Sequence, residues 1–447
     1  TKKKGFPTAF WVCACTEIFE RLAYYLGRSL ILIFVTASVA TGGLGLSDTV
    51  AANMQSNLTA FSYLLPLFGA VIVDKYIGAR YTTPVGMFIA AAGYFTGGIA
   101  KSSAGVYAMI FLVSLGLALF KNGAIIGRVI TDKSQMDPAF SMRYTLVNVG
   151  AFIGTFLVGI LYKDVFAKDG VLGFAPCFKM AALMMVLGGL WYIFVCWRFL
   201  GDLGKLPFKK TLTEEEKAAE AKKKEETGTK QPLTTIEKKR IGAIFVASLF
   251  SIVFWIFWYL GYMPVYFYWA ENMDWVVAGY QVPSTWFDAA NSLFCVILGP
   301  VTAALWKKLA ARPQGDMSLF RKTGLGIAII GVGYLFYAAI DIMRGGEKAS
   351  VLWLIVFAFL LTMGEMFFSP LGHSFISKYS PSRYLAVMMS VWGFATFIAA
   401  KSYGPVYGLL FGGKIEFKVA CIGVAVVSFA AALIMIALDK KLSALVD

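Results

Sequence analysis

The sequence predicts an all-α membrane protein with twelve transmembrane helices in two six-helix bundles and both termini in the cytoplasm. Of its 447 residues, 58% are hydrophobic and only 15% are charged, whereas soluble domains are about 25% charged. This composition excludes a soluble enzyme, a disordered chain and a disulfide scaffold. Twelve apolar stretches are long enough for spans of about 20 residues each, and one long charged segment divides them into six and six.

The apolar stretches follow one another with short polar breaks between them. They cover 10–36, 51–73, 82–101, 105–128, 139–162, 177–200, 241–267, 285–306, 323–343, 351–377, 385–411 and 417–438. The charges at the start of the chain precede a stretch that continues to the length of a full helix without a cleavage-like end. We therefore interpret this stretch as the first span and not as a signal peptide.

The distribution of Lys and Arg predicts the orientation. Most of the 41 basic residues fall in the two terminal segments and the even-numbered loops. The odd-numbered loops carry fewer, namely Lys101, Lys163, Lys168, Lys179, Arg344, Lys348, Lys414 and Lys418. Because cytoplasmic loops are enriched in Lys and Arg, this bias predicts a cytoplasmic amino terminus. The net charge of +15 is then a topology signal, and no nucleic-acid partner is expected.

The longest polar break runs over 201–240 and predicts a solvated cytoplasmic helix or a mobile linker. The predicted domains are an amino-terminal bundle over 1–200, this linker, and a carboxyl-terminal bundle over 241–447. The plan resembles the major facilitator fold, in which two halves rock about a site near the middle of the bilayer.

The loop after the second span, GAVIVDKYIGAR, resembles the signature loop of the same superfamily. Asp74, Gly78 and Arg80 stand at its acidic, glycine and basic positions. Gly78 is expected to permit a tight turn, and Asp74 is expected to hydrogen-bond the end of a neighbouring helix. An ordinary polar turn is the alternative interpretation.

Charged residues inside apolar spans are the main functional signal, because a charge at the centre of a spanning helix costs about 2.5–3.5 kcal/mol. At about 100° per residue, six polar residues of the first span fall within about 140° of arc. These six are Glu17, Glu20, Arg21, Tyr24, Tyr25 and Arg28. Their spacing is expected to pair Glu17 with Arg21, and Arg21 with Tyr24 or Tyr25. A purely structural ion network is the alternative.

Two more charges stand alone in their spans. Lys121 has no acid within a turn, so it is expected to need a partner, either an acid of the first span or the substrate. Glu365 is the clearest buried carboxylate of the second half. Asn148 and Asn291 are amides on apolar helices, and such amides are more often packing contacts than ligands.

The pattern Glu-x-x-Glu-Arg-x-x-Tyr-Tyr over 17–25 resembles the signature of the proton-coupled oligopeptide transporters. Further stretches agree with that family in order: Leu-Phe-Lys121, Tyr144-x-x-x-Asn148-x-Gly150, Glu365-Met-Phe-Phe-Ser369-Pro370-Leu-Gly372, Ser380-Pro381-Ser-Arg383 and Met388-Met389-Ser-Val-Trp392. Two features depart from it. Tyr259 and Leu260 follow Trp258 where members often have Glu-Gln, and the chain lacks the two extra helices that many bacterial relatives carry between the halves.

The resemblance implies a symporter that imports di- and tripeptides together with protons by alternating access. No metal and no cofactor other than the coupling proton is expected. The residues expected in proton coupling are Glu17, Glu20, Arg21 and Lys121. Those expected at the peptide carboxylate are Arg28, Lys121, Tyr24, Tyr25 and Tyr63. Those expected at the peptide amine are Glu365, Asn148 and Asn291. Those expected in the pocket wall are Tyr144, Ser369, Trp392 and Trp258.

The expected location is a bacterial plasma membrane, in which the chain is a multi-pass protein embedded in lipid and works as a monomer. One alternative is a proton-linked porter of another small zwitterionic or anionic solute. An intramembrane hydrolase that uses Glu17 and Glu20 as acid and base is a remote alternative, because no metal-ligand set or nucleophile–histidine pair supports it. A channel is a further alternative.

Overall fold

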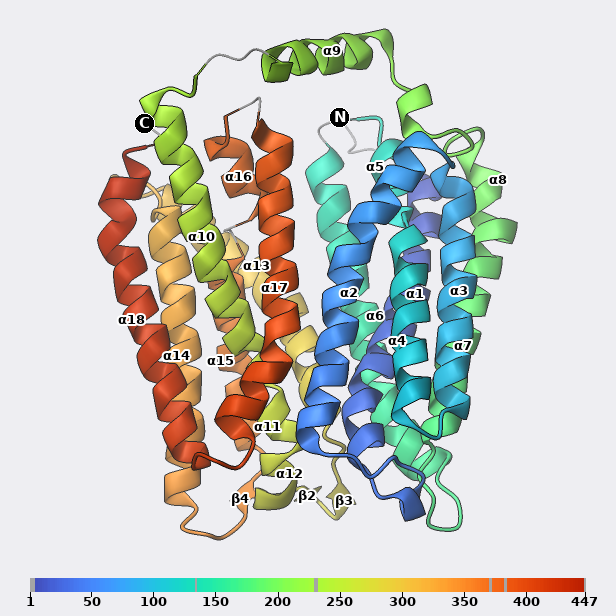
Figure 1. The fold of residues 1–447 in the computed structure, drawn as a ribbon, viewed down its shortest axis with the longest axis vertical. Helices are drawn as coiled ribbons and strands as arrows, with labels where there is room; N and C mark the ends of the chain where they lie inside the picture. Colours follow the sequence, from blue (N-terminus) through green and yellow to red (C-terminus); the bar gives the residue numbers. More distant parts are fainter. Residues whose placement is uncertain (1–4, 133–134, 229–231, 370–371, 382–383, 446–447) are drawn as a thin grey trace. The chain divides into compact units, whose positions relative to one another are not determined.

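A computed structural model describes residues 5–132, 135–228, 232–369, 372–381 and 384–445. The described chain is mostly helical (Figure 1). It divides into two compact units. Unit 1 comprises Thr1–Leu212 and Pro283–Leu293, and unit 2 comprises Thr213–Val282 and Phe294–Asp447.

Unit 1 contains the first half of the chain, drawn from blue to green in Figure 1. Its helices are α1 (Thr8–Thr36), η1 (Val39–Thr41), α2 (Asp48–Lys75), α3 (Ala79–Ile99), α4 (Ser103–Leu119), α5 (Asn122–Val129), α6 (Met136–Ile160), η3 (Leu161–Val165), α7 (Phe174–Trp191), η4 (Tyr192–Cys196), α8 (Trp197–Leu200) and η5 (Phe208–Lys210). Of these, η3 and η4 are short π-helices that continue α6 and α7.

The helices of unit 1 pack around α1, which contacts α2, α6 and α7, while α3 contacts α4 and α7. A core of apolar side chains from several of these helices includes Phe10, Ile125 and Tyr192. The fourth predicted span is not one helix. It breaks after Leu119, and α5 begins at Asn122.

Unit 2 begins with α9 (Glu214–Gly228), the charged helix of the predicted linker. Thr213 caps it, because its hydroxyl accepts from the backbone N–H of Glu216 at 3.2 Å and the Glu216 carboxylate accepts from the Thr213 N–H at 2.9 Å. This reciprocal pair is a capping box. The helical alternative for the charged segment is therefore confirmed for these residues.

The remaining elements of the second half include four strands of two residues each. They are α10 (Thr235–Leu260), α11 (Met263–Tyr266), α12 (Tyr268–Asn272), β1 (Met273–Asp274), β2 (Val276–Val277), β3 (Tyr280–Gln281), α13 (Trp286–Ala310), α14 (Leu319–Met343), β4 (Ala349–Ser350), α15 (Trp353–Phe368), α16 (His373–Tyr379), α17 (Leu385–Phe411) and α18 (Phe417–Ser443). Strands β1 and β4 pair in parallel, and β2 and β3 form an antiparallel hairpin. In unit 2, α14 packs against α15 and α18, and α10 packs against α17.

Nine helical segments of the described chain are long and apolar enough to cross a membrane. They are Asp48–Lys75, Ser103–Val129, Pro138–Val165, Phe174–Leu200, Thr235–Asn272, Trp286–Ala310, Leu319–Met343, Leu385–Phe411 and Phe417–Ser443. The helix α1 is not among them, because it carries the charged residues Glu17, Glu20, Arg21 and Arg28. The predicted apolar stretches nevertheless fall largely on helices.

Candidate functional site

The polar stripe of the first span lies on α1. Glu17 and Glu20 are 2% and 1% exposed, so both side chains are withdrawn from solvent. Tyr24 and Arg28 of the same stripe are buried as well. A buried charge is unfavourable unless an opposite charge and hydrogen bonds compensate for it. The contacts of the two acids therefore determine what the stripe can do.

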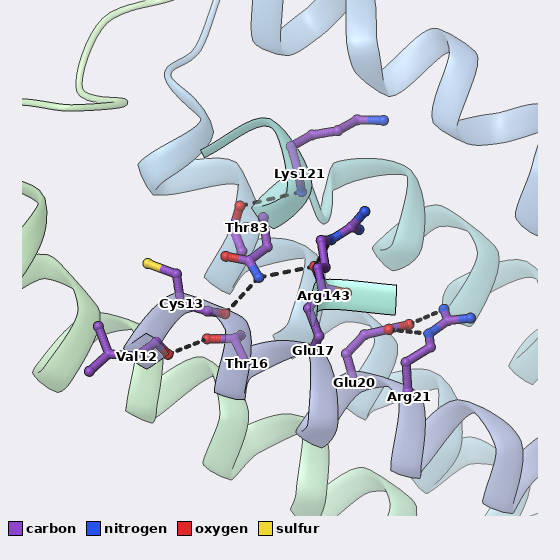
Figure 2. A network of polar contacts seen from close by, with 10 residues as sticks. Val12, Cys13, Thr16, Glu17, Glu20, Arg21, Thr83, Lys121 and Arg143 are labelled. Atoms are coloured by element: carbon purple, nitrogen blue, oxygen red, sulfur yellow. Dashed lines mark hydrogen bonds and ion pairs between the residues drawn. The ribbon is translucent and has the colours of Figure 1, made fainter. Parts of the chain in front are cut away.

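Glu20 pairs with its neighbour Arg21 (Figure 2). The Nε and one Nη atom of Arg21 donate to the two carboxylate oxygens of Glu20, a bidentate geometry that strengthens the pair. The guanidinium carbon lies 4.5 Å from the ring centroid of Tyr24 and 5.7 Å from that of Tyr25. The predicted contact of Arg21 with these tyrosines is confirmed. The predicted pair of Arg21 with Glu17 is wrong, because the Nε and one Nη donor of the Arg21 guanidinium bind Glu20.

Glu17 instead faces α5 and α6. Its Oε1 accepts hydrogen bonds from Nε of Arg143 and from Nδ2 of Asn122, each at 3.1 Å. Asn122 is fully buried, and its amide also donates to the carbonyl of Cys13 at 2.8 Å. Glu17 therefore joins three helices through one cation and one amide, and Figure 2 shows these contacts converging on its side chain.

Sequence reasoning misses both partners of Glu17. It counts Arg143 with the cytoplasmic loop charges, because this residue lies near the start of the fifth apolar stretch. A signal is nevertheless present, since Arg143 is the one charged residue in 139–162 and directly precedes Tyr144 of the family pattern. Asn122 similarly follows Lys121 directly. Neither signal indicates which acid the residue contacts, because that depends on how the helices pack.

Lys121 occupies the break between α4 and α5. Its backbone N–H donates to Oγ1 of Thr83 at 3.3 Å, and its Nζ donates to the carbonyl of Pro66 at 2.8 Å. In Figure 2 the ammonium points away from Glu17 and Glu20. Within the described chain Lys121 forms no ion pair, so the acid of the first span is not its partner in this structure.

Arg28 is anchored to α2. Its Nε donates to Oγ1 of Thr59 at 3.3 Å, and its carbonyl accepts from Nε2 of Gln55 at 3.1 Å. The side chain is 7% exposed. Tyr63, which the sequence places beside it at the substrate carboxylate, also lies on α2 but is 46% exposed.

The three residues expected at the substrate amine belong to different units. Asn148 lies on α6 and donates its Nδ2 to the carbonyl of Tyr144 at 3.0 Å. Asn291 is buried in the part of α13 that belongs to unit 1. Glu365 lies half-buried on α15 of unit 2, where Sγ of Cys295 is 3.8 Å from its Oε2. The two amides thus share a unit, and Glu365 belongs to the other.

The predicted wall residues differ in exposure. Tyr144 on α6 is 48% exposed, whereas Trp392 on α17 is 8% exposed and Trp258 on α10 is half-buried. Ser369 ends α15 on an exposed position, where its N–H donates to the carbonyl of Glu365 at 2.8 Å. Pro370, which follows it in the family pattern, lies outside the described residues.

In the seventh predicted span, packing contacts involve the two residues at which the sequence departs from the family pattern. Tyr259 stacks on Tyr403 of α17, with ring centroids 4.7 Å apart, and Leu260 is fully buried. An aromatic contact between α10 and α17 therefore stands where family members often have an acid.

Arg80 organises the signature loop. Its two Nη atoms donate to the carbonyls of Gly201 and Trp197 at 2.6 and 2.7 Å, and its guanidinium carbon lies 5.3 Å from the centroid of the Trp197 ring. Trp197 is the first residue of the four-residue helix α8 and Gly201 directly follows this helix, so both carbonyls lie in the last turn, where no partner exists within the helix. The guanidinium therefore caps a helix carboxyl terminus.

This arrangement corrects the expectation for Asp74 and gives a physical reason for Gly78. The neighbouring helix presents carbonyls, which need donors, and a carboxylate can only accept, so Arg80 fills the role expected of Asp74. Gly78 lies in the short turn between α2 and α3, and a close approach requires glycine there. Its φ is −64°, and a Cβ there would lie 2.0 Å from the carbonyl oxygen of Gly204.

Comparison with known sequences gives a family and named relatives. A sequence profile described as POT family matches residues 203–411. The uncharacterized transporter YclF of Bacillus subtilis (strain 168) is 25% identical over 439 residues, covering 89% of this chain and 87% of its own length. A di-/tripeptide transporter of Lactococcus lactis subsp. cremoris is 24% identical over 440 residues, covering 87% of this chain and 86% of its own length.

Solved structures resemble the chain over nearly its whole length. A crystal structure of peptide transporter POT in complex with sulfate has a TM-score of 0.86 at 23% identity, covering 99% of this chain and 97% of its own. A POT family transporter in complex with 5-aminolevulinic acid has a TM-score of 0.85 at 23% identity, covering 98% of each chain. A tetrameric protein, PepTSo2, has a TM-score of 0.78 at 20% identity, also covering 98% of each chain. The likeness shows that the chain shares the helical fold of these structures.

Proposed function

We propose that the chain is a member of the POT family and a proton-coupled symporter that imports di- and tripeptides by alternating access. It is a transporter and not an enzyme, and it is an integral, multi-pass protein of the plasma membrane. The intramembrane hydrolase considered from the sequence is thereby excluded.

We also propose the complete topology that the sequence predicts. It has twelve spans, with bundles over 1–200 and 241–447, the charged linker between them, and both termini in the cytoplasm. The bias of Lys and Arg between loops supports this orientation. The proton is the coupling ion, no other cofactor takes part, and a single chain is the working unit because each chain carries both bundles.

The observation that carries the proposal is the pair of buried acids on α1, each bonded to a different arginine. A proton that binds Glu17 or Glu20 removes the charge that holds the arginine beside it. Ionised groups are energetically unfavourable inside the bilayer. Protonation of the acid therefore shifts the equilibrium from the charged, bonded acid–arginine pair to a state in which the arginine is released. The drive is about 1.4 kcal/mol per pH unit and about 2.3 kcal/mol per charge per 100 mV.

The proposed substrate contacts follow from the distribution of charge. Arg28 and Lys121, with Tyr24, Tyr25 and Tyr63, would bind the peptide carboxylate. A neutral carbonyl, and not a carboxylate, holds the ammonium of Lys121, so its positive charge remains available to an anion. Glu365, Asn148 and Asn291 would bind the amine of a dipeptide about 7 Å long. The proposed wall residues are Tyr144, Ser369, Trp392 and Trp258.

Uptake of labelled dialanine into proteoliposomes tests the proposal. With an inward proton gradient, uptake should be saturable and concentrative, and a protonophore should reduce it to the level of equilibration. Uptake that does not saturate would indicate a channel. Saturable uptake that is indifferent to the gradient would contradict proton coupling.

A porter of another small zwitterionic solute is the second candidate. Two observations favour it: Tyr259 and Leu260 replace the acid-bearing pair of the family, and a similar structure contains 5-aminolevulinic acid. Competition separates the two functions. If unlabelled 5-aminolevulinic acid reduces the driven uptake of labelled 5-aminolevulinic acid but dialanine does not, the substrate is not a peptide.

A further inference from the structure

We infer that Arg143 is a positioning residue for proton coupling, which links the charge on Glu17 to the packing of α5 and α6 against α1. The inference rests on the proposed symport and adds a residue that the transport signature does not contain. It also distinguishes the two acids of α1, because among the described residues Glu17 alone of the two is bonded to other helices.

The partners of the two acids differ in kind. Glu20 is bonded to the adjacent residue of its own helix, so this pair survives any movement of α1 as a whole. Glu17 is bonded to Arg143 of α6 and to Asn122 of α5. These two bonds exist only while the three helices keep their present arrangement. Loss of charge on Glu17 is therefore transmitted to other helices, whereas loss of charge on Glu20 acts first on Arg21.

Close backbone packing holds Arg143 beside Glu17. A Cβ at Gly154 of α6 would lie 2.6 Å from the carbonyl oxygen of Leu22 of α1, so only glycine permits this approach. On the other side, a Cβ at Gly123 of α5 would lie 2.8 Å from an Nη atom of Arg143. The guanidinium thus lies against the backbone of α5 while its Nε donates to the acid. The Arg143 side chain is 31% exposed, so these contacts enclose part of it.

The break before α5 gives the contact a mechanical consequence. Because α4 ends at Leu119, α5 is a short helix that is not continuous with the span before it. Asn122 at its first position is bonded to Glu17 and to the carbonyl of Cys13. Protonation of Glu17 leaves one oxygen as a hydroxyl and weakens both charge-assisted bonds. The start of α5 and the guanidinium above it are then released together.

Charged and titratable groups on the surrounding helices complete the environment of Glu17. They are Cys13, Glu20 and Arg21 of α1, Lys121 at the break before α5, and Arg143 of α6. Of the cations among them, Arg21 is bonded to Glu20 and Lys121 to the carbonyl of Pro66. Arg143 is accordingly the cation that is paired with Glu17 and that is released when Glu17 loses its charge.

The test compares Arg143→Gln, Arg143→Lys and Arg128→Gln in proteoliposomes with labelled dialanine. Arg128 is a matched control, because it lies on α5, stacks over Phe208 at 4.3 Å and has no part in the network. For Arg143→Gln we expect gradient-driven uptake to fall about tenfold or more, while counterflow exchange stays within about twofold, since a transition-specific contact affects only the coupled step. Arg143→Lys should restore part of the driven uptake, and Arg128→Gln should behave as the wild type.

Driven uptake by Arg143→Gln at the wild-type rate would overturn the inference, and so would an equal loss of driven uptake and exchange. A second measurement does not depend on transport. In a double-mutant cycle of Glu17→Gln and Arg143→Gln, the loss of apparent melting temperature in the double variant should be smaller than the sum of the single losses. Additive losses would overturn the pair. If the wild type fails to concentrate dialanine but the cycle shows coupling, the proposed substrate or symport is wrong and the pair stands.

Discussion

Replacing Arg80 with alanine is expected to destabilise the end of α8. The change removes two hydrogen bonds, of 2.6 and 2.7 Å, to the carbonyls of Gly201 and Trp197. A hydrogen bond to a charged group contributes about 1.5–3 kcal/mol, and a cation over an aromatic ring contributes about 0.5–2 kcal/mol. Contacts that share one side chain do not add fully, so we expect a loss of about 3–4 kcal/mol.

The apparent melting temperature of the purified protein measures this loss. A unit of 150–250 residues shifts by about 2–4 °C per kcal/mol, so Arg80→Ala should lower the temperature by about 6–16 °C. Arg80→Lys should lose about half as much, because an ammonium lacks the planar fork that reaches two carbonyls. Lys75→Ala is the control, since Lys75 is an exposed basic residue of the same loop, and it should shift the temperature by about 2 °C or less.

A shift for Arg80→Ala no larger than that for Lys75→Ala would refute the capping argument. If the guanidinium alone caps the helix, Asp74→Asn should change the melting temperature much less than Arg80→Ala. If these two variants were equally destabilised, the acid would share the role that we assign to the guanidinium, and the geometric reasoning would be wrong.

Three further predictions concern transport in proteoliposomes. Glu17→Gln and Glu20→Gln should each abolish gradient-driven uptake of dialanine while exchange continues, because exchange needs no net proton transfer; concentrative uptake by both variants would contradict coupling through α1. Lys121→Ala should remove driven uptake, and a C-terminally amidated dipeptide should compete more weakly than the free acid in the wild type; equal competition counts against a carboxylate site at Lys121. N-acetylation of dialanine should weaken competition about tenfold in the wild type, as expected for a charge-assisted bond of about 1.5–3 kcal/mol, and less in Glu365→Gln; the same penalty in both proteins would remove Glu365 from the amine site.

The sequence predicts the helical membrane fold well because the bilayer imposes a strong pattern on composition. Runs of apolar residues separated by charged breaks identify helices without any knowledge of their neighbours. The break before Lys121 is not predictable in this way, since Leu-Phe-Lys contains neither Pro nor Gly. Bonds from other helices satisfy the polar groups there, including Oγ1 of Thr83 for the Lys121 N–H.

The site is predictable in part for the same reason. Helical periodicity places Glu17 and Arg21 on one stripe, and in the structure Glu17 is buried while Arg21 is half-buried. Periodicity within a helix cannot choose between the adjacent Glu20 and a residue four positions away as the partner of Arg21. It also cannot supply Arg143, because that contact exists only when α6 packs against α1.

The glycine contact between α1 and α6 has a consequence for how unit 1 can deform. At Gly154 the two backbones meet without a layer of side chains between them, so the helices have no room to slide at that level. Gly150 lies one turn earlier, where a Cβ would be 3.0 Å from Cβ of Arg21. Any tilt of α6 must then pivot about this seam. Arg143 stands two turns from Gly150, about 10 Å along the helix axis. A small tilt of α6 about this contact would therefore displace Arg143 more than it displaces Gly150.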